Sequence, residues 1–138
     1  MSAADNKRTM QRIFEGLARG DSQAFRESLA EDFVWTLPGT SSWSGTWRGR
    51  AVFDDLFVPL YRQWADTYLN TAENIVAEDD FVVVECRGDV TTKAGKPYNN
   101  TYCWVCRFDA QGRLAQVTEY CDTALIDAVL EPPPARAA

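Results

Sequence analysis

The chain has 138 residues, a formal net charge of −6, and an ordinary globular balance of 46% hydrophobic and 25% charged residues. This length fits one domain with a core of its own. An acidic chain without a basic stripe is a poor binder of nucleic acid or anionic membranes. The chain has no histidine, which excludes Ser-His and Cys-His mechanisms and histidine metal sites.

Helical spacing of apolar residues dominates the first half of the chain, with strands and a loop between the helices. We expect a helix around 10–18 that stops at Gly20, a short helix capped by Asp21 or Ser22, a strand over 33–37, a loop over 38–45, a helix over 52–64 kinked at Pro59, and a strand over 68–77.

Alternating, β-branched segments dominate the second half. We expect strands over 81–93, 98–109 and 113–121, turns at 94–96 and 110–112, and a short helix over 123–130. One domain therefore covers 1–131, and the Pro- and Ala-rich tail over 132–138 is expected to be disordered. Helices followed by an antiparallel meander predict an α+β cone, with the helices on the concave face of a curved sheet and a deep pocket between them.

Strict alternation assigns side chains to the two faces of this sheet. The inner face is predicted to carry Val82, Val84, Cys86, Gly88, Val90, Asn100, Tyr102, Trp104, Cys106, Phe108, Leu114, Gln116, Thr118, Tyr120 and Asp122. The outer face is predicted to carry Val83, Glu85, Arg87, Asp89, Thr91, Thr101, Cys103, Val105, Arg107, Val117, Glu119 and Cys121. Cys103 and Cys106 then point to opposite faces, which favours structural thiols over a redox or zinc site.

Asp122 is the one carboxylate that alternation places inside, beside Tyr102, Trp104 and Tyr120. Aromatic walls disfavour the charged carboxylate and raise its pKa, as a general acid/base needs. The alternative is that Asp122 simply caps the helix that begins at Thr123. On the outer face, an apolar strip of Val83, Val105 and Val117 between paired charges suits a homodimer contact.

Four segments carry a resemblance to a known family. They are "GLARGDSQAFRESLAEDFVW", "TLPGTSSWSGTWRGR", "VVVECRGDVTTKAGKPYNNTYCWVCRFDAQGRL" and "VTEYCDT". The chain resembles the SnoaL-like polyketide cyclase branch of the nuclear-transport-factor-2-like (NTF2-like) superfamily, which includes ketosteroid-isomerase-related proteins. The resemblance implies an α+β cone, a homodimer through the open sheet face, and a pocket for a small, fairly apolar molecule.

The resemblance also indicates which chemistry to expect. Ketosteroid isomerases carry a base aspartate where this chain has Leu37 and an oxyanion-hole tyrosine near Ile13, so that machinery is not expected here. Polyketide-cyclase relatives carry an acid/base aspartate on the last strand, and Asp122 matches its position. Their helper histidine has no counterpart here.

Epoxide-hydrolase relatives suggest a third set of site residues. Arg87, Asp89 and Asp122 reproduce the residue types of their Asp-Arg-Asp triad. Alternation, however, places Arg87 and Asp89 on the face opposite to Asp122, and only a bulge would bring them together.

The sequence thus predicts a cytoplasmic homodimer that binds a small apolar molecule and uses no cofactor, metal, nucleic acid or membrane. If it is an enzyme, Asp122 performs a proton transfer in an isomerisation, a polyketide-cyclase-like reaction or a hydration. The alternatives are a non-catalytic binding or interaction module, and epoxide hydrolysis through Arg87 and Asp89. The predicted pocket residues are Trp35, Asn100, Tyr102, Trp104, Tyr120, Tyr61 and Trp64.

Overall fold

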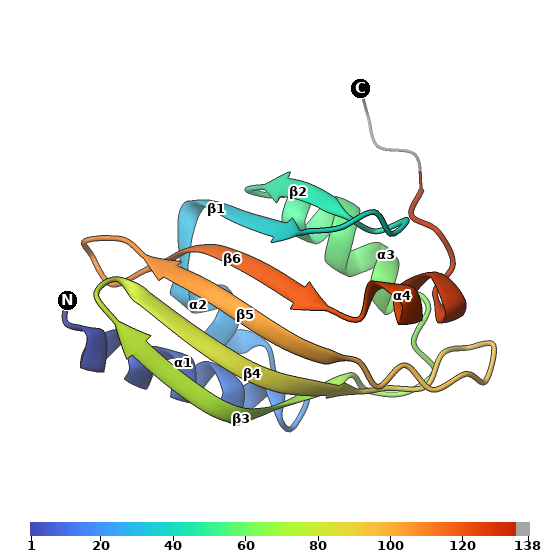
Figure 1. The fold of residues 1–138 in the computed structure, drawn as a ribbon, viewed down its shortest axis with the longest axis horizontal. Helices are drawn as coiled ribbons and strands as arrows, with labels where there is room; N and C mark the ends of the chain where they lie inside the picture. Colours follow the sequence, from blue (N-terminus) through green and yellow to red (C-terminus); the bar gives the residue numbers. More distant parts are fainter. Residues whose placement is uncertain (135–138) are drawn as a thin grey trace.

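The computed structural model describes residues 1–134 and shows one curved six-stranded sheet partly covered by helices (Figure 1). The helical elements are α1 (Ala3–Leu17), α2 (Gln23–Ser28), the π-helix η1 (Val52–Phe57), α3 (Val58–Tyr61) and α4 (Thr123–Val129). The strands are β1 (Leu29–Leu37), β2 (Gly45–Arg48), β3 (Leu69–Glu78), β4 (Phe81–Asp89), β5 (Thr101–Phe108) and β6 (Leu114–Cys121). The predicted α+β class is confirmed.

The strands lie in the order β2-β1-β6-β5-β4-β3. β1 and β6 run parallel, and every other neighbouring pair is antiparallel. The chain leaves β2 through η1 and α3 and enters the sheet again at its far edge, on β3. β1 and β3 therefore lie on opposite sides of the β4–β5–β6 meander, and helices α1, α2 and α3 lie together on one face of the sheet (Figure 1).

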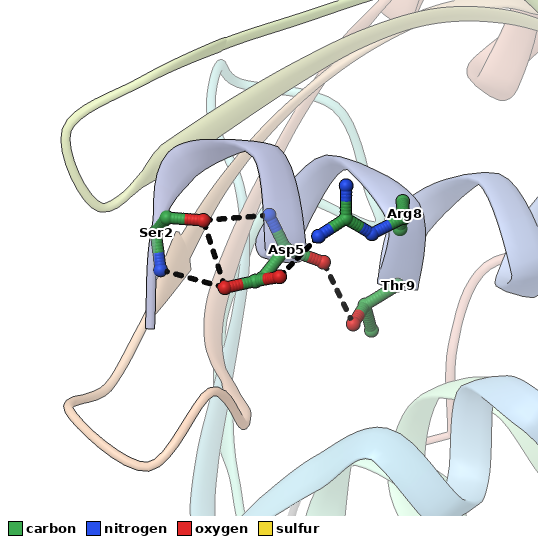
Figure 2. A network of polar contacts seen from close by, with 4 residues as sticks. All are labelled: Ser2, Asp5, Arg8 and Thr9. Carbon is green, nitrogen blue, oxygen red and sulfur yellow. Dashed lines mark hydrogen bonds and ion pairs between the residues drawn. The ribbon is translucent and has the colours of Figure 1, made fainter.

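Helix α1 begins with a capping box (Figure 2). The hydroxyl of Ser2 accepts a hydrogen bond from the backbone N–H of Asp5 at 3.1 Å, and the carboxylate of Asp5 accepts one from the N–H of Ser2 at 3.1 Å. Arg8 pairs with the same carboxylate, and Thr9 donates to the Asp5 carbonyl. The hydrogen bonds from Ser2 lower the pKa of Asp5. With its first turn satisfied, α1 buries Met10, Ile13 and Phe14 against the sheet.

The predicted inner faces of β4 and β5 are confirmed. Every inner position of the two strands is buried, from Val82 to Gly88 and from Tyr102 to Phe108. Cys103 and Cys106 lie on opposite faces, and all four cysteines are free. The alternation works here because the β4–β5 register is unbroken from Phe81↔Arg107 to Arg87↔Thr101.

The predicted faces of β6 are wrong beyond Leu114, because the strand contains a bulge. Phe108 pairs with Leu114, but the next residue back along β5, Arg107, pairs with Gln116, so Ala115 is an extra residue. One extra residue exchanges the two faces of the rest of a strand. Val117 is therefore fully buried, and Tyr120 is 52% exposed. Glu119 and Cys121 move inward, and Gln116, Thr118 and Tyr120 move outward.

Other boundaries differ from those expected. The helix predicted over 52–64 ends at Tyr61, and its winding changes from π to α at Val58, directly before Pro59. Trp64 lies beyond the helix and forms a short bridge with Thr92. The strand predicted over 81–93 ends at Asp89. Of the tail predicted over 132–138, residues 135–138 lie outside the described part of the chain.

Within the described residues, no helix is both long enough and apolar enough to cross a lipid bilayer.

Candidate functional site

A cavity of about 100 Å³ lies between the concave face of the sheet and the helices. Its lining combines residues from the sheet with residues from α1, α2, η1, α3 and α4. The lining residues are Leu17, Ser22, Phe25, Trp35, Leu37, Trp43, Leu56, Phe57, Leu60, Tyr61, Trp64, Tyr68, Asn70, Tyr98, Tyr102, Trp104, Glu119, Ile126 and Leu130. No lysine or arginine is among these described residues, so the wall is apolar apart from a few polar groups.

Aromatic rings that contact each other at an angle form one wall. The Trp35 and Trp104 rings lie 5.1 Å apart at 83°, and Phe57 meets Trp35 at the same distance and angle. Phe14 and Phe25 pack against Trp104 from the helical side. Edge-to-face packing of this kind fixes the rings and leaves flat apolar surface for a ligand.

Glu119 is the one carboxyl group that lines the cavity. Its Oε2 accepts a 2.9 Å hydrogen bond from Nε1 of Trp104. Burial raises the pKa of Glu119 to about 8, because only the Trp104 N–H offsets the loss of hydration. The Glu119 residue as a whole is half-buried, because part of its surface borders the cavity. Glu119 therefore holds a proton at neutral pH and can release it near that pH.

A cluster of three phenols and two amides lies close to Glu119. The hydroxyl of Tyr68 donates to that of Tyr102 at 2.9 Å, and Tyr102 lies close enough to Tyr98 to influence the pKa of the Tyr98 phenol. The amide of Asn100 donates to Tyr98 at 3.0 Å, and the amide of Asn70 reaches Tyr68 at 3.5 Å. Burial raises the pKa of all three phenols, so they remain neutral and act as hydrogen-bond donors and acceptors.

Gly88 makes room for this cluster. A Cβ atom there would lie 2.8 Å from the Tyr68 hydroxyl oxygen and 3.0 Å from the Tyr102 ring. A larger residue at this inner position of β4 would displace the Tyr68 and Tyr102 side chains and break the hydrogen bond between their hydroxyl groups.

The structure places five of the seven predicted pocket residues on the cavity wall. They are Trp35, Tyr61, Trp64, Tyr102 and Trp104. Asn100 is buried beside the cavity and acts through its hydrogen bond to Tyr98. Tyr120 points to the outer face, because of the bulge in β6, and its prediction as a pocket residue is wrong.

Asp122 lies outside the cavity, so its predicted inward position is wrong. It is exposed and caps α4, where its carboxylate accepts hydrogen bonds from the N–H groups of Ala124 at 3.1 Å and Leu125 at 3.3 Å. The alternative interpretation of Asp122 as a helix cap is confirmed. Its backbone is held by Asn100, which accepts from its N–H and donates to its carbonyl.

The alternative set of Arg87 and Asp89 does not converge with Asp122. Both residues are exposed on the outer face of β4, and Arg87 pairs with Glu73 at 3.9 Å. The bulge in β6 exchanges the faces of that strand up to Cys121, but Asp122 lies beyond the strand, where its carboxylate caps α4. Epoxide hydrolysis through these three residues is therefore not supported.

Sequence reasoning missed Glu119, Tyr68, Asn70 and Tyr98. One feature of the sequence pointed to Glu119. Leu114 and Val117 are both apolar but three residues apart, so a regular strand cannot bury both. An extra residue between them buries both and turns Glu119 inward as well. No three Cys, Asp or Glu side chains of residues 1–134 gather in a group that could hold a metal ion.

Solved structures show the same fold. An NTF2-like protein from Burkholderia thailandensis E264 is 22% identical and matches 96% of this chain and 100% of its own with a TM-score of 0.78. A putative SnoaL-like polyketide cyclase from Jannaschia sp. CCS1 is 16% identical, with 96% and 95% coverage and a TM-score of 0.74. TerC, co-crystallised with polyporic acid, is 16% identical, with 91% and 97% coverage and a TM-score of 0.75. No curated protein matches the chain.

The model of the SnoaL-like domain matches residues 10–117, from the centre of α1 to the centre of β6. This match covers most of the chain and includes Trp35, Tyr68, Tyr102 and Trp104 of the cavity wall, and it ends two residues before Glu119. The chain therefore belongs to the SnoaL-like domain family.

Proposed function

We propose that the cavity binds a small, largely apolar ring compound and that Glu119 catalyses a proton transfer on it without a cofactor. The observation that carries this proposal is the enclosed Glu119 carboxyl group, which is held by Trp104 at 2.9 Å and has a pKa of about 8. A general base or acid works best when its pKa lies near the working pH. Glu119 takes the role that the sequence assigned to Asp122.

The proposed step is enolisation followed by return of the proton. In its ionised form, which is the minor form at pH 7 and the major form above about pH 8, Glu119 removes a proton from a carbon next to a carbonyl group, and the C–H electron pair forms the enolate. Returning that proton to another carbon isomerises the substrate and regenerates the carboxylate. In an aldol-type cyclisation, the same enolate instead forms a C–C bond to a second carbonyl carbon within the molecule, and the resulting alkoxide takes the proton back from Glu119, which regenerates the carboxylate.

Two structural neighbours support this class of substrate. TerC was crystallised with polyporic acid, and another neighbour is described as a putative SnoaL-like polyketide cyclase. The aromatic wall of Trp35, Phe57 and Trp104 offers an apolar surface on which such rings could pack.

Exchange of carbon-bound hydrogen for deuterium tests the proposal without knowledge of the natural substrate. The probe is 2-tetralone, a bicyclic ketone with acidic C–H groups, followed by NMR in D₂O. The wild-type protein should accelerate exchange above the buffer rate, and Glu119→Gln should abolish the acceleration. Glu85→Gln, which changes an exposed carboxylate on the outer face of β4, is the matched control and should exchange as the wild type does.

Two outcomes would overturn parts of the proposal. Equal exchange by Glu119→Gln and the wild type would remove Glu119 from the chemistry. Binding of the probe without any acceleration by the wild type would leave a non-catalytic binding module.

We also propose a homodimer through the outer face of the sheet. One row of paired residues crosses this face, from Val76 through Val83 and Val105 to Thr118. Val76 is 63% exposed and Phe81, on the same face, 42% exposed. Thr118 takes the place that the sequence assigned to Val117, which is buried in the core.

A further inference from the structure

A second hollow, of about 270 Å³, adjoins the aromatic cavity, and we call it the outer hollow. Most of the residues that line the outer hollow also line the aromatic cavity, and these shared residues are Leu17, Ser22, Tyr61, Trp64 and Tyr68. They come from two parts of the chain: the end of α1 with the turn after it, and the segment from the end of α3 to the start of β3. Because both walls run from one space into the other, neither wall separates the two hollows.

Both walls of the outer hollow are held in place by the backbone. The turn after α1 contains Gly20, which has a φ of 79° and lies so close to Thr67 that a Cβ atom would collide with the Thr67 methyl group. On the opposite wall, the N–H of Ala65 bonds the carbonyl of Thr91 at 2.8 Å. A hollow with fixed walls loses little entropy when a ligand binds in it.

Asp66 is the charged residue that lines the outer hollow. It is exposed, and its Oδ1 accepts a hydrogen bond from the backbone N–H of Thr91 at 2.9 Å, which orients the carboxylate. Within residues 1–134, its second oxygen, Oδ2, has no hydrogen-bond partner and no ion pair. This oxygen is therefore available to a ligand that donates a hydrogen bond.

No lysine or arginine among the described residues lines either hollow. Two arginines close to the turn after α1 have other partners, because Arg26 donates to Oγ of Ser22 at 2.6 Å and Arg19 lies 3.8 Å from Asp21. Glu119 lines the aromatic cavity only, and with a pKa of about 8 it is mostly uncharged at pH 7. The charge in the wall of the outer hollow is therefore the negative charge of Asp66.

We propose that the outer hollow is a second subsite, in which Asp66 accepts a hydrogen bond from a hydroxyl group at the far end of an elongated ring compound. The ring at the near end of the ligand fills the aromatic cavity, and the part between the two ends passes Tyr61 and Trp64. A carboxylate at the far end would instead bring a second negative charge beside Asp66. This inference rests on the proposed function and adds the far end of its substrate.

The test compares ligands that share the 2-tetralone skeleton and carry substituents of similar length at C6, the end away from the ketone. These substituents are propoxy, 2-hydroxyethoxy and carboxymethoxy, and calorimetry at pH 7 measures the affinities. The wild-type protein should bind the hydroxyethoxy compound at least as tightly as 2-tetralone, and about tenfold more tightly than the carboxymethoxy compound. Asp66→Asn keeps an acceptor for Thr91 and removes the charge, so it should reduce the tenfold difference to about twofold.

Asp89→Asn is the matched control, because it removes the same charge from an exposed residue on the outer face of β4. It should keep the tenfold difference, which would show that the net charge of the protein is not its cause.

An unchanged difference in Asp66→Asn would overturn the role of Asp66. Weaker binding of the hydroxyethoxy compound than of 2-tetralone to the wild type would show that the aromatic cavity does not continue into the outer hollow, and would overturn the subsite while the proposed function stands. Failure of the wild type to bind 2-tetralone would overturn the proposed function itself.

A second readout uses the wild-type protein, in case Asp66→Asn does not fold. The backbone N–H of Thr91 reports on Asp66, because it donates to the same carboxylate. Its NMR resonance should move when the hydroxyethoxy compound binds and much less when the propoxy compound binds. Equal shifts with the two compounds would contradict a hydrogen bond from the ligand hydroxyl to Asp66.

Discussion

Burial, more than its one hydrogen-bond partner, decides the behaviour of the Glu119 carboxyl group. Desolvation raises its pKa, and the single N–H of Trp104 lowers it only in part, so the balance lies at about 8. The nearby phenols are neutral and add no positive charge. An apolar ligand that displaces water from the cavity should raise the pKa of Glu119 further.

The raised pKa makes the stability of the fold depend on pH. Since Glu119 binds its proton more tightly when folded than when unfolded, its contribution is fully present below its ordinary pKa of 4.5 and is lost as the pH rises through about 8. We expect the free energy of unfolding to fall by about 2–4 kcal/mol over this range because of Glu119.

Urea unfolding of the wild type and of Glu119→Gln at pH 5 and pH 8 checks this expectation. The variant keeps an acceptor for Trp104 and has no charge to bury, so its stability should change less between the two pH values. A parallel change in both proteins would mean that other groups cause the pH dependence.

At the scale of elements, regular alternation predicted β4 and β5 correctly, because their register is unbroken. It failed for β6, where a single extra residue, Ala115, reversed every later side chain. The sequence could not place this bulge, because Ala fits either face. It could reveal only a conflict between Leu114 and Val117, which are both fully buried.

Helix α4 depends on Asp122 as its cap. Asp122→Ala should cost about 0.5–2 kcal/mol in the free energy of unfolding, because two N–H groups of the first turn lose their acceptor. Asp122→Asn should cost much less, and it should not reduce the exchange of 2-tetralone. Thermal unfolding and the exchange assay measure the two effects, and loss of exchange in Asp122→Asn would return the catalytic role to Asp122.

At the scale of the molecule, the site was only partly predictable. Composition and alternation predicted an aromatic cavity with Trp35, Tyr102 and Trp104 on its wall. Tyr68, Asn70 and Tyr98 reach the same cavity from the residue before β3, from the start of β3 and from the loop before β5, where no local pattern shows which side chains point inward. Long-range packing, rather than sequence periodicity, brings these groups together.

The outer face of the sheet leads to a prediction about assembly. Val105 is partly buried on that face, in the row between Val83 and Thr118, so Val105→Asp should leave the fold intact. It should convert a dimer to a monomer, because the free energy needed to bury an unpaired charge exceeds the free energy gained from the apolar contact. Analytical ultracentrifugation measures both proteins, and a monomeric wild type would contradict the proposed dimer.

The central claim is that Glu119 is the proton carrier of the cavity. Titration of its side-chain carboxyl by ¹³C NMR, assigned with Glu119→Gln, tests this claim most directly. The structure predicts a midpoint at about 8, well above the ordinary value of 4.5. A midpoint at or below 4.5 would show that Glu119 is ionised and hydrated in the folded protein, and would contradict its role as the proton carrier.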